Sequence, residues 1–388
     1  MYKFICTIIV CLLLLIPVGG LAQETAPATP PVSTPADAST PAATPDQPAT
    51  TPETPDTSLP ASPPASLNPD ISVIGNMLGS SGSHNVDPSL PKQHCQLDEL
   101  EVVVGSKIYP GVSGLGVFTV GGEKDSSVQV EEGYITVEQL LPIAPIGARA
   151  GILRLPFGKA NPLHPHAEPY ADTPAVINNL LGEFRGNGAE LVALIPTHSS
   201  LFLEAHLGRW KSVGDNPEDT TETFGDKPLT LGRLWASLPI GESIEAELGA
   251  SAAYGAADPA VPFQSADLSL QGVDTTWRFY LPHEQRIELL AEGMQRKEPG
   301  TTSRGFYVLG TYRPGHFYEF GSRYDWCEAA QDSTKHESYV SLFATRFLSE
   351  MTYLRLQVKS GTNEDHQHVN EIIAQVVFGF GPHTHPLQ

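Results

Sequence analysis

The run RLPFGKANPLHPHAEPYADTP, residues 154–174, carries side chains that could bind a metal ion. His164, His166 and Glu168 alternate along it, and alternate side chains of an extended backbone point the same way. Imidazole nitrogens and carboxylate oxygens are zinc ligands, so these three residues form a candidate metal site. The five prolines of the run favour a second interpretation, a stiff structural loop. The position of the run in the fold decides between the two.

Other kinds of chemistry find less support in the sequence. It contains no Gly-x-Ser-x-Gly elbow, no His-Glu-x-x-His pair and no Cys-x-x-Cys pair, so we predict that the protein is not an enzyme. We expect no cofactor, with zinc considered only as a transported or loop-bound ion. The 23 basic residues against 44 acidic ones exclude nucleic-acid binding, which requires a basic surface.

The first 67 residues of the chain divide into two segments that precede the main domain. Residues 1–22 contain Lys3, an apolar run and the small-residue motif Gly-Leu-Ala, which predicts a secretory signal peptide. Residues 23–67 consist almost entirely of Pro, Ala, Thr, Ser and acidic residues, which predicts a disordered linker in the periplasm. Residues 68–388 remain for a folded domain.

The folded domain is dominated by a two-residue alternation of apolar and polar side chains. This pattern predicts β-strands with one apolar and one polar face, clearest in the segments SIEAELGASAAYG, GHFYEFGSRYDW, MTYLRLQVKS and NEIIAQVVFGF. In a membrane barrel the polar faces line the lumen. The charged residues that we place in the lumen are Glu245, Glu247, Arg278, Glu319, Arg323, Asp325, Arg355 and Lys359.

The connections between these strands alternate in length. Tight turns such as residues 238–243 and 281–285 alternate with longer loops, among them 158–187, 211–227, 255–264, 297–303 and 328–335. Alternating short turns and long loops are typical of outer-membrane β-barrels. Fourteen candidate strands follow residue 112, and residues 100–109 and 71–78 add two more. We therefore predict an all-β antiparallel transmembrane barrel of about 16 strands, with 14 as the alternative.

This topology places the loop 158–187 on the extracellular side. We favour a constriction loop that folds over or into the channel mouth, with His164 and His166 hydrogen-bonded to carboxylates of the barrel wall. The zinc site remains the alternative. The same topology places Cys95 and Cys327 at the extracellular rim, where an oxidising compartment makes a disulfide between them plausible.

Several segments resemble the zinc-regulated TonB-dependent receptor-like barrels of the outer membrane. The resemblance covers residues 68–388 and is carried by LNPDISVIGNML, GILRLPFGKANPLHPHAEPYADTP, NNLLGEFRGNGAELVALIPT and the closing VVFGFGPHTHP. It implies metal-linked uptake through an outer-membrane barrel. The chain is too short to add a plug domain to a 22-stranded barrel, so a porin-like barrel is expected.

The expected function is therefore the passage of small solutes, with metal ions such as zinc among them, across the outer membrane of a Gram-negative-type bacterium. The alternative is a structural or surface protein of the envelope, such as an adhesin, with a periplasmic tether and no transport. The expected partners are membrane lipid, lipopolysaccharide, the barrel-assembly machinery and the solute. A homotrimer is the oligomer that we consider.

Overall fold

The computed structural model describes residues 69–82, 95–122, 127–142, 144–212, 228–255, 268–330 and 332–382. The predicted signal peptide (1–22) and linker (23–67) lie outside these residues, as do most of the loops 211–227 and 255–264. Within the described ranges, no helix is long and apolar enough to cross a membrane.

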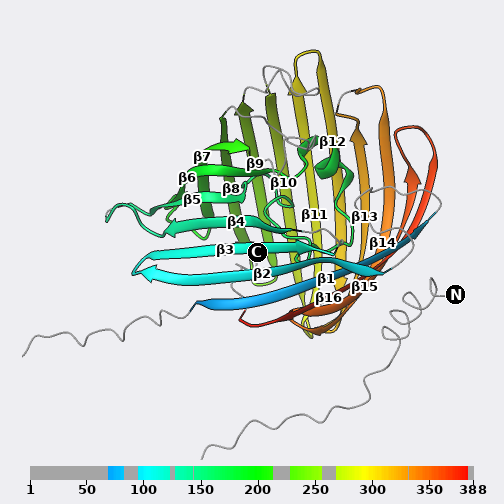
Figure 1. The fold of residues 1–388 in the computed structure, drawn as a ribbon, viewed down its shortest axis with the longest axis horizontal. Helices are drawn as coiled ribbons and strands as arrows, with labels where there is room; N and C mark the ends of the chain where they lie inside the picture. Colours follow the sequence, from blue (N-terminus) through cyan, green and yellow to red (C-terminus); the bar gives the residue numbers. More distant parts are fainter. Residues whose placement is uncertain are drawn as a thin grey trace, which may run out of the picture. The chain divides into compact units, whose positions relative to one another are not determined.

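The described residues form one closed antiparallel barrel of sixteen strands, in which each strand pairs with its neighbours in the sequence (Figure 1). The first half of the wall consists of β1 (Asp70–Gly82), β2 (Gln96–Tyr109), β3 (Val112–Gly121), β4 (Val128–Val137), β5 (Ile146–Arg154), β6 (Arg185–Leu194), β7 (Phe202–Ser212) and β8 (Leu229–Ile240). The second half consists of β9 (Ile244–Gly255), β10 (Leu268–Leu281), β11 (Gln285–Glu298), β12 (Thr301–Arg313), β13 (Tyr318–Glu328), β14 (His336–Ser349), β15 (Thr352–Thr362) and β16 (His368–Phe380). Pairing of β1 with β16 closes the wall, so the predicted 16-stranded barrel is confirmed and the 14-stranded alternative is wrong.

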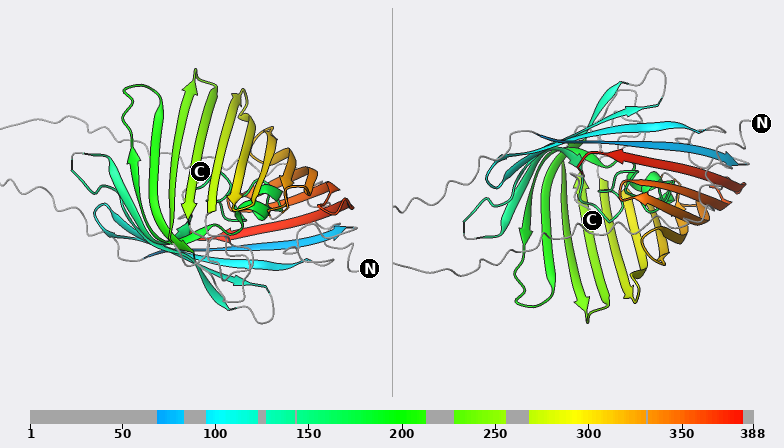
Figure 2. Two further views of the ribbon diagram at one scale, coloured as in Figure 1. Left: turned by 90° about the horizontal axis from the view of Figure 1, so that it is seen from above. Right: turned by 90° about the horizontal axis from the view of Figure 1, so that it is seen from below.

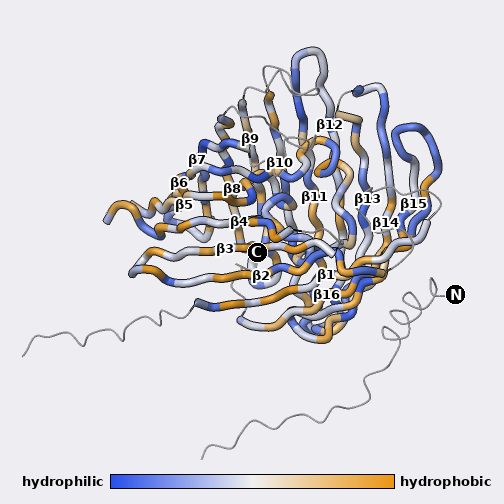
Figure 3. Tube along the Cα trace, viewed as in Figure 1, coloured by the Kyte–Doolittle hydropathy of each residue, from blue (hydrophilic) through white to orange (hydrophobic). Residues whose placement is uncertain are grey.

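The strands follow the alternation that predicted them. In β9, Leu248 and Tyr254 are 63% and 54% exposed on the outer face, whereas Glu247 and Ser251 are buried on the inner face. Apolar and polar residues accordingly alternate along much of the wall (Figure 3). A barrel with this pattern presents an apolar outer surface and encloses most of its charges.

Tight turns join the strands at one end of the barrel, as predicted. At the other end several of the connections are much longer. The expected loop 297–303 is a two-residue turn, because pairing between β11 and β12 continues to Glu298 and Thr301. Gly300, with φ of 90°, adopts the left-handed backbone that this tight turn requires.

Residues 155–184, which we call the lumen loop, connect β5 and β6 and fold into the barrel. Two views perpendicular to that of Figure 1 show this segment inside the wall (Figure 2). It includes one short helical turn, η2 (Ile177–Leu181), which packs near β11 and β12. The prediction of a loop folded into the barrel is confirmed.

Candidate functional site

The lumen loop is attached to widely separated strands of the wall. On one side, the Gly158 amide donates a hydrogen bond to the Ser251 hydroxyl of β9 at 3.1 Å. The Ala160 amide donates to Glu292 Oε2 of β11 at 3.1 Å. On the other side, Arg355 of β15 donates from Nη1 to the carbonyl oxygen of Tyr170 at 2.7 Å. The loop therefore crosses the lumen.

Gly158 permits the close approach of the loop to β11. Its φ of 66° lies in the left-handed region, and a Cβ atom there would be 1.7 Å from Glu292 Oε1. Any other residue would strain the backbone and displace the carboxylate that holds Ala160. The glycine of the sequence Phe-Gly-Lys thus allows the loop to pass close to β11.

An apolar cluster fills the part of the lumen nearest the long connections. The rings of Phe157 and Phe184, both fully buried, meet edge to face with centroids 5.7 Å apart. Inward-facing side chains near the loop end of the strands pack against them and their neighbours in the loop. These wall residues include Trp210, Leu229, Leu231, Leu268, Leu270, Met294 and Leu309. The lumen is therefore packed at this level, where a water-filled channel would have polar walls.

Asp172 is the centre of a buried ion-pair network between the loop and the wall. Its Oδ1 accepts from Arg323 Nη2 of β13 at 2.9 Å, and its Oδ2 accepts from Lys359 Nζ of β15 at 2.5 Å. Gln357 also donates to Oδ1. Burial alone would raise the pKa of Asp172, but the two cations hold it below its usual range. The carboxylate stays ionised and ties the loop to β13 and β15.

His164 lies in a second polar cluster, among carboxylates of β2 and β4. Its Nδ1 is 3.0 Å from Glu101 Oε2 and 3.5 Å from Glu131 Oε1, and its Nε2 is 3.4 Å from Glu132 Oε2. Burial opposes protonation of the imidazole, but the three carboxylates raise its pKa well above the usual value. The predicted contact of the loop histidines with wall carboxylates is confirmed.

The predicted triad of His164, His166 and Glu168 is not assembled. Among the described residues, the groups able to offer ligand atoms to one ion are Glu101, Glu131 and His164, and Glu99, Glu101 and His166. Glu168 belongs to neither. The backbone is not extended here, because the Ala167 amide donates to the His164 carbonyl at 2.8 Å and forms a turn. Burial raises the pKa of Glu168 to about 8.

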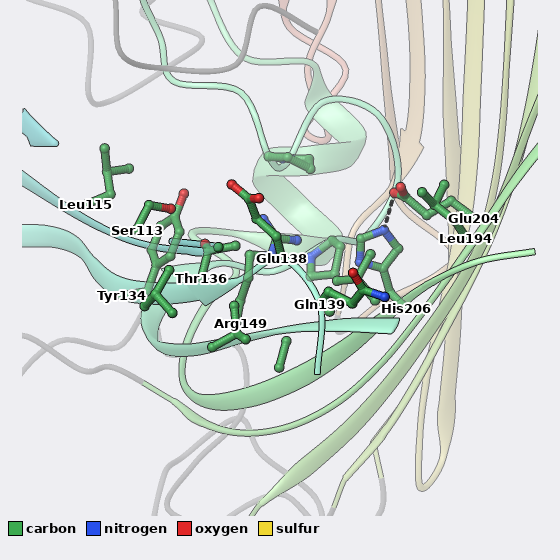
Figure 4. Close-up of a pocket in the computed structure, with 18 of the residues that line it drawn as sticks. Ser113, Leu115, Tyr134, Thr136, Glu138, Gln139, Arg149, Leu194, Glu204 and His206 are labelled. Carbon is green, nitrogen blue, oxygen red and sulfur yellow. Dashed lines mark hydrogen bonds and ion pairs between the residues drawn. The ribbon is translucent and has the colours of Figure 1, made fainter. Parts of the chain in front are cut away.

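Two cavities lie at the barrel end that carries the tight turns, one on each side of the lumen loop. A cavity of about 1590 Å³ is lined by Lys159 and Pro162 of the loop and by β2 to β10. Its wall carries charges of both signs, and Figure 4 shows Arg149, Glu138 and the Glu204–His206 pair around it. A second cavity of about 1020 Å³ is lined by loop residues 166–169 and by β10 to β15.

The predicted lumen charges divide among these sites. Glu245, Glu247 and Arg278 line the larger cavity, and Glu319 and Arg355 line the smaller one. The other three, Arg323, Asp325 and Lys359, are buried in or beside the Asp172 network.

The cysteine prediction is not realised in this structure. Cys327 is a buried thiol whose Sγ donates to the Glu328 carbonyl oxygen at 3.1 Å. It faces into the lumen next to Gly305 of β12 and joins the apolar cluster. It is therefore not bonded to Cys95.

Sequence reasoning placed Arg323, Arg355 and Lys359 in the lumen but missed their partners in the loop and the carboxylates around His164. Asp172 and Gly158 belong to the quoted run, and their types, an acid and a glycine between prolines, were the available signal. Glu101, Glu131 and Glu132 gave none, because only the folded wall brings β2 and β4 to His164.

Comparisons with known proteins identify the fold. No family model matches the chain, and no curated protein matches its sequence. Solved structures do match. An anion-selective porin from Comamonas acidovorans aligns with a TM-score of 0.55 and 11% identity over 81% of this chain and 99% of the porin. The outer-membrane channel DcaP of Acinetobacter baumannii aligns with a TM-score of 0.52 and 13% identity over 81% of this chain and 96% of the channel. The trimer form of OmpT, an outer-membrane protein of Vibrio cholerae, aligns with a TM-score of 0.51 and 10% identity over 81% of this chain and 100% of OmpT. At such identities the likeness establishes the barrel fold.

Proposed function

We propose that the protein is an outer-membrane, porin-like channel for small polar solutes in which the lumen loop forms a closed gate. The closed 16-stranded barrel with an apolar outer face and a charged interior carries this proposal. The predicted signal peptide supports export, and the structural likeness to porins and channels agrees with it. Insertion by the barrel-assembly machinery, contact with lipopolysaccharide and a trimeric assembly belong to the same proposal.

The two cavities indicate the class of solute. Their linings combine Lys159, Arg278 and Arg355 with Glu247 and Glu319, so positive and negative groups face the same space. Mixed charges create a transverse field that favours polar and zwitterionic solutes over apolar ones. The family resemblance of the sequence adds metal ions to the candidate solutes.

The apolar cluster also favours a second function. A lumen packed by Phe157, Phe184 and their neighbours would suit a structural envelope barrel that transports nothing. The two functions differ in one respect. A channel requires that the loop can leave the lumen, whereas a structural barrel requires only that it stays.

Planar-bilayer recordings separate the two. We would compare the wild type with a variant in which residues 158–181 are replaced by a Gly–Ser linker of equal length. The expected result is small or intermittent conductance for the wild type and large ohmic conductance for the variant. If neither conducts, although both migrate as folded, heat-modifiable barrels on gels, the channel is refuted and the structural function is favoured.

A further inference from the structure

The carboxylate cluster around His164 has the ligand types and spacing of a transition-metal site. Zinc binds nitrogen and oxygen ligands at about 2.0–2.2 Å, so neighbouring ligand atoms around a tetrahedral ion are about 3.3–3.6 Å apart. His164 Nδ1 lies 3.0 Å from Glu101 Oε2 and 3.5 Å from Glu131 Oε1. All three side chains are buried, and their ligand atoms lie within 4.8 Å of one another.

The second ring nitrogen of His164 also has the partner that a metal-bound histidine requires. Metal-binding histidines usually donate their other N–H to a carboxylate, which fixes the ring and its tautomer. Glu132 Oε2 lies 3.4 Å from His164 Nε2. Arg154 contacts Glu131 through Nε at 2.9 Å and so orients that carboxylate. Two neighbouring residues therefore hold the ligands in place.

A β-bulge brings two of these carboxylates to the same side of the wall. In the pairing of β3 with β4, Val117 faces Glu132 and Phe118 faces Val130, so Glu131 is an extra residue. Consecutive residues of a regular strand point to opposite faces, yet both glutamates are buried inside the barrel. Bulges re-aim side chains in this way next to functional sites.

Within the part of the chain that the structure describes, carboxylates outnumber the cationic side chains of this cluster. Glu99, Glu101, Glu131 and Glu132 meet here, and the described cationic groups that pair with them are Arg154 and the imidazoles of His164 and His166. Glu99 Oε1 is buried without a hydrogen-bond partner. Buried carboxylates are costly unless they are paired or coordinate a metal. A divalent ion would take the place of the proton on His164 Nδ1 and add positive charge to the cluster.

We propose that Glu101, Glu131 and His164 bind one divalent transition-metal ion of the zinc class, which fastens the lumen loop to β2 and β4. An imidazole among the ligands favours zinc over magnesium or calcium, which prefer all-oxygen sites. Glu132 and Arg154 are positioning residues. The effect on gating rests on the proposed channel function, whereas the site itself does not.

Isothermal titration of the refolded full-length protein with Zn²⁺, after treatment with a chelator, tests the site. We expect one tight site per chain, weakened at least tenfold in Glu101→Gln and His164→Ala and about 10–100-fold in Glu132→Gln. The matched control His366→Ala/His368→Ala removes an exposed histidine pair and should retain the site. Lack of Zn²⁺ binding by the wild type, or binding that only the control abolishes, would overturn the proposal. Equal affinity for Mg²⁺ would overturn the choice of a transition metal.

The gating effect needs a separate measurement. In planar bilayers, Zn²⁺ should lengthen the closed times of the wild type and leave Glu101→Gln unchanged. If zinc binds without any effect on conductance, the metal site stands but the proposal that it fastens the loop is refuted. Zinc binding by a barrel that never conducts, even with the loop replaced, would refute the channel instead.

Discussion

At the scale of single residues, Asp172 is the strongest link between the loop and the wall. It is buried with Arg323 and Lys359, and Arg355 holds the neighbouring Tyr170 carbonyl. Removing one partner of a buried ion pair costs about 3–5 kcal/mol, because the remaining charge is left without compensation. Here one substitution would take the carboxylate from Lys359 and leave Arg323 with Asp325 alone.

We therefore expect Asp172→Asn to release the lumen loop from the wall while the sixteen strands remain paired. Hydrogen exchange followed by mass spectrometry should show faster exchange over residues 155–184 and unchanged exchange in the strands. The control Asp365→Asn removes an exposed carboxylate that pairs with Lys335 at 3.1 Å and should have little effect. Equal protection of the loop in both variants would contradict this role of Asp172.

The same carboxylate makes loop docking depend on pH. Its pKa is lower in the docked state than in the undocked state, so the stabilisation is complete above about pH 4, the ordinary range of an aspartate. The stabilisation is lost progressively as the pH falls below that range. Conductance of the wild type should accordingly increase on acidification below pH 4. Asp172→Asn should lack this increase in conductance below pH 4. An identical acid response in both proteins would contradict the role of Asp172 in the pH dependence.

At the scale of elements, the inner faces of the strands have two zones. Near the tight turns the inward residues are charged, as in Glu247 and Arg278, and near the loops they are apolar, as in Leu229 and Leu231. The apolar zone is stable in water only when the lumen loop covers it. The loop and the wall are therefore parts of one core.

Truncation of Phe157 tests this coupling. Replacing Phe by Ala in a packed core lowers stability by about 3–5 kcal/mol. Because Phe157 packs in the lumen against Phe184, the substitution destabilises the docked state of the loop. We expect Phe157→Ala to raise the open fraction in single-channel recordings severalfold. The control Phe306→Ala removes a ring that is 39% exposed on the outer face and should not change gating. Identical open fractions in all three proteins would mean that packing does not close the lumen.

The sequence predicted the elements better than it predicted their contacts. The alternation in segments such as 244–254 predicted strands, and counting connections gave sixteen, because both signals are local. The inward direction of Leu229 and Leu231 could not be predicted, because the alternation rule assigns apolar side chains to the outer, lipid-facing side of the barrel. The bulge at Glu131 breaks the period without any local signal. Glu168 was misplaced because a turn at His164 interrupts the extended backbone.

At the scale of the whole molecule, the apolar outer face requires a membrane. Leu248, Leu207 and Val273 are each at least 60% exposed, which a barrel in water would not tolerate over so much of its surface. We expect Leu248→Arg to lower the unfolding free energy in phospholipid vesicles by about 2–4 kcal/mol. Glu242→Arg, in the exposed turn before β9, should change it by less than about 0.5 kcal/mol. Equal stability of the two variants would mean that this face does not contact lipid.

The path of the lumen loop also fixes an order of folding events. Its contacts reach wall residues far later in the chain, as in the hydrogen bond from the Tyr353 hydroxyl to the His166 carbonyl, 187 positions apart. Contacts of such sequence separation form late, because the intervening chain must first be in place. The barrel must therefore close around an undocked loop, and the newly assembled protein passes through a state with an unfilled interior. During refolding into vesicles, the gel shift of the closed barrel should precede protection of residues 155–184, so that each molecule is most permeable at the moment of its assembly.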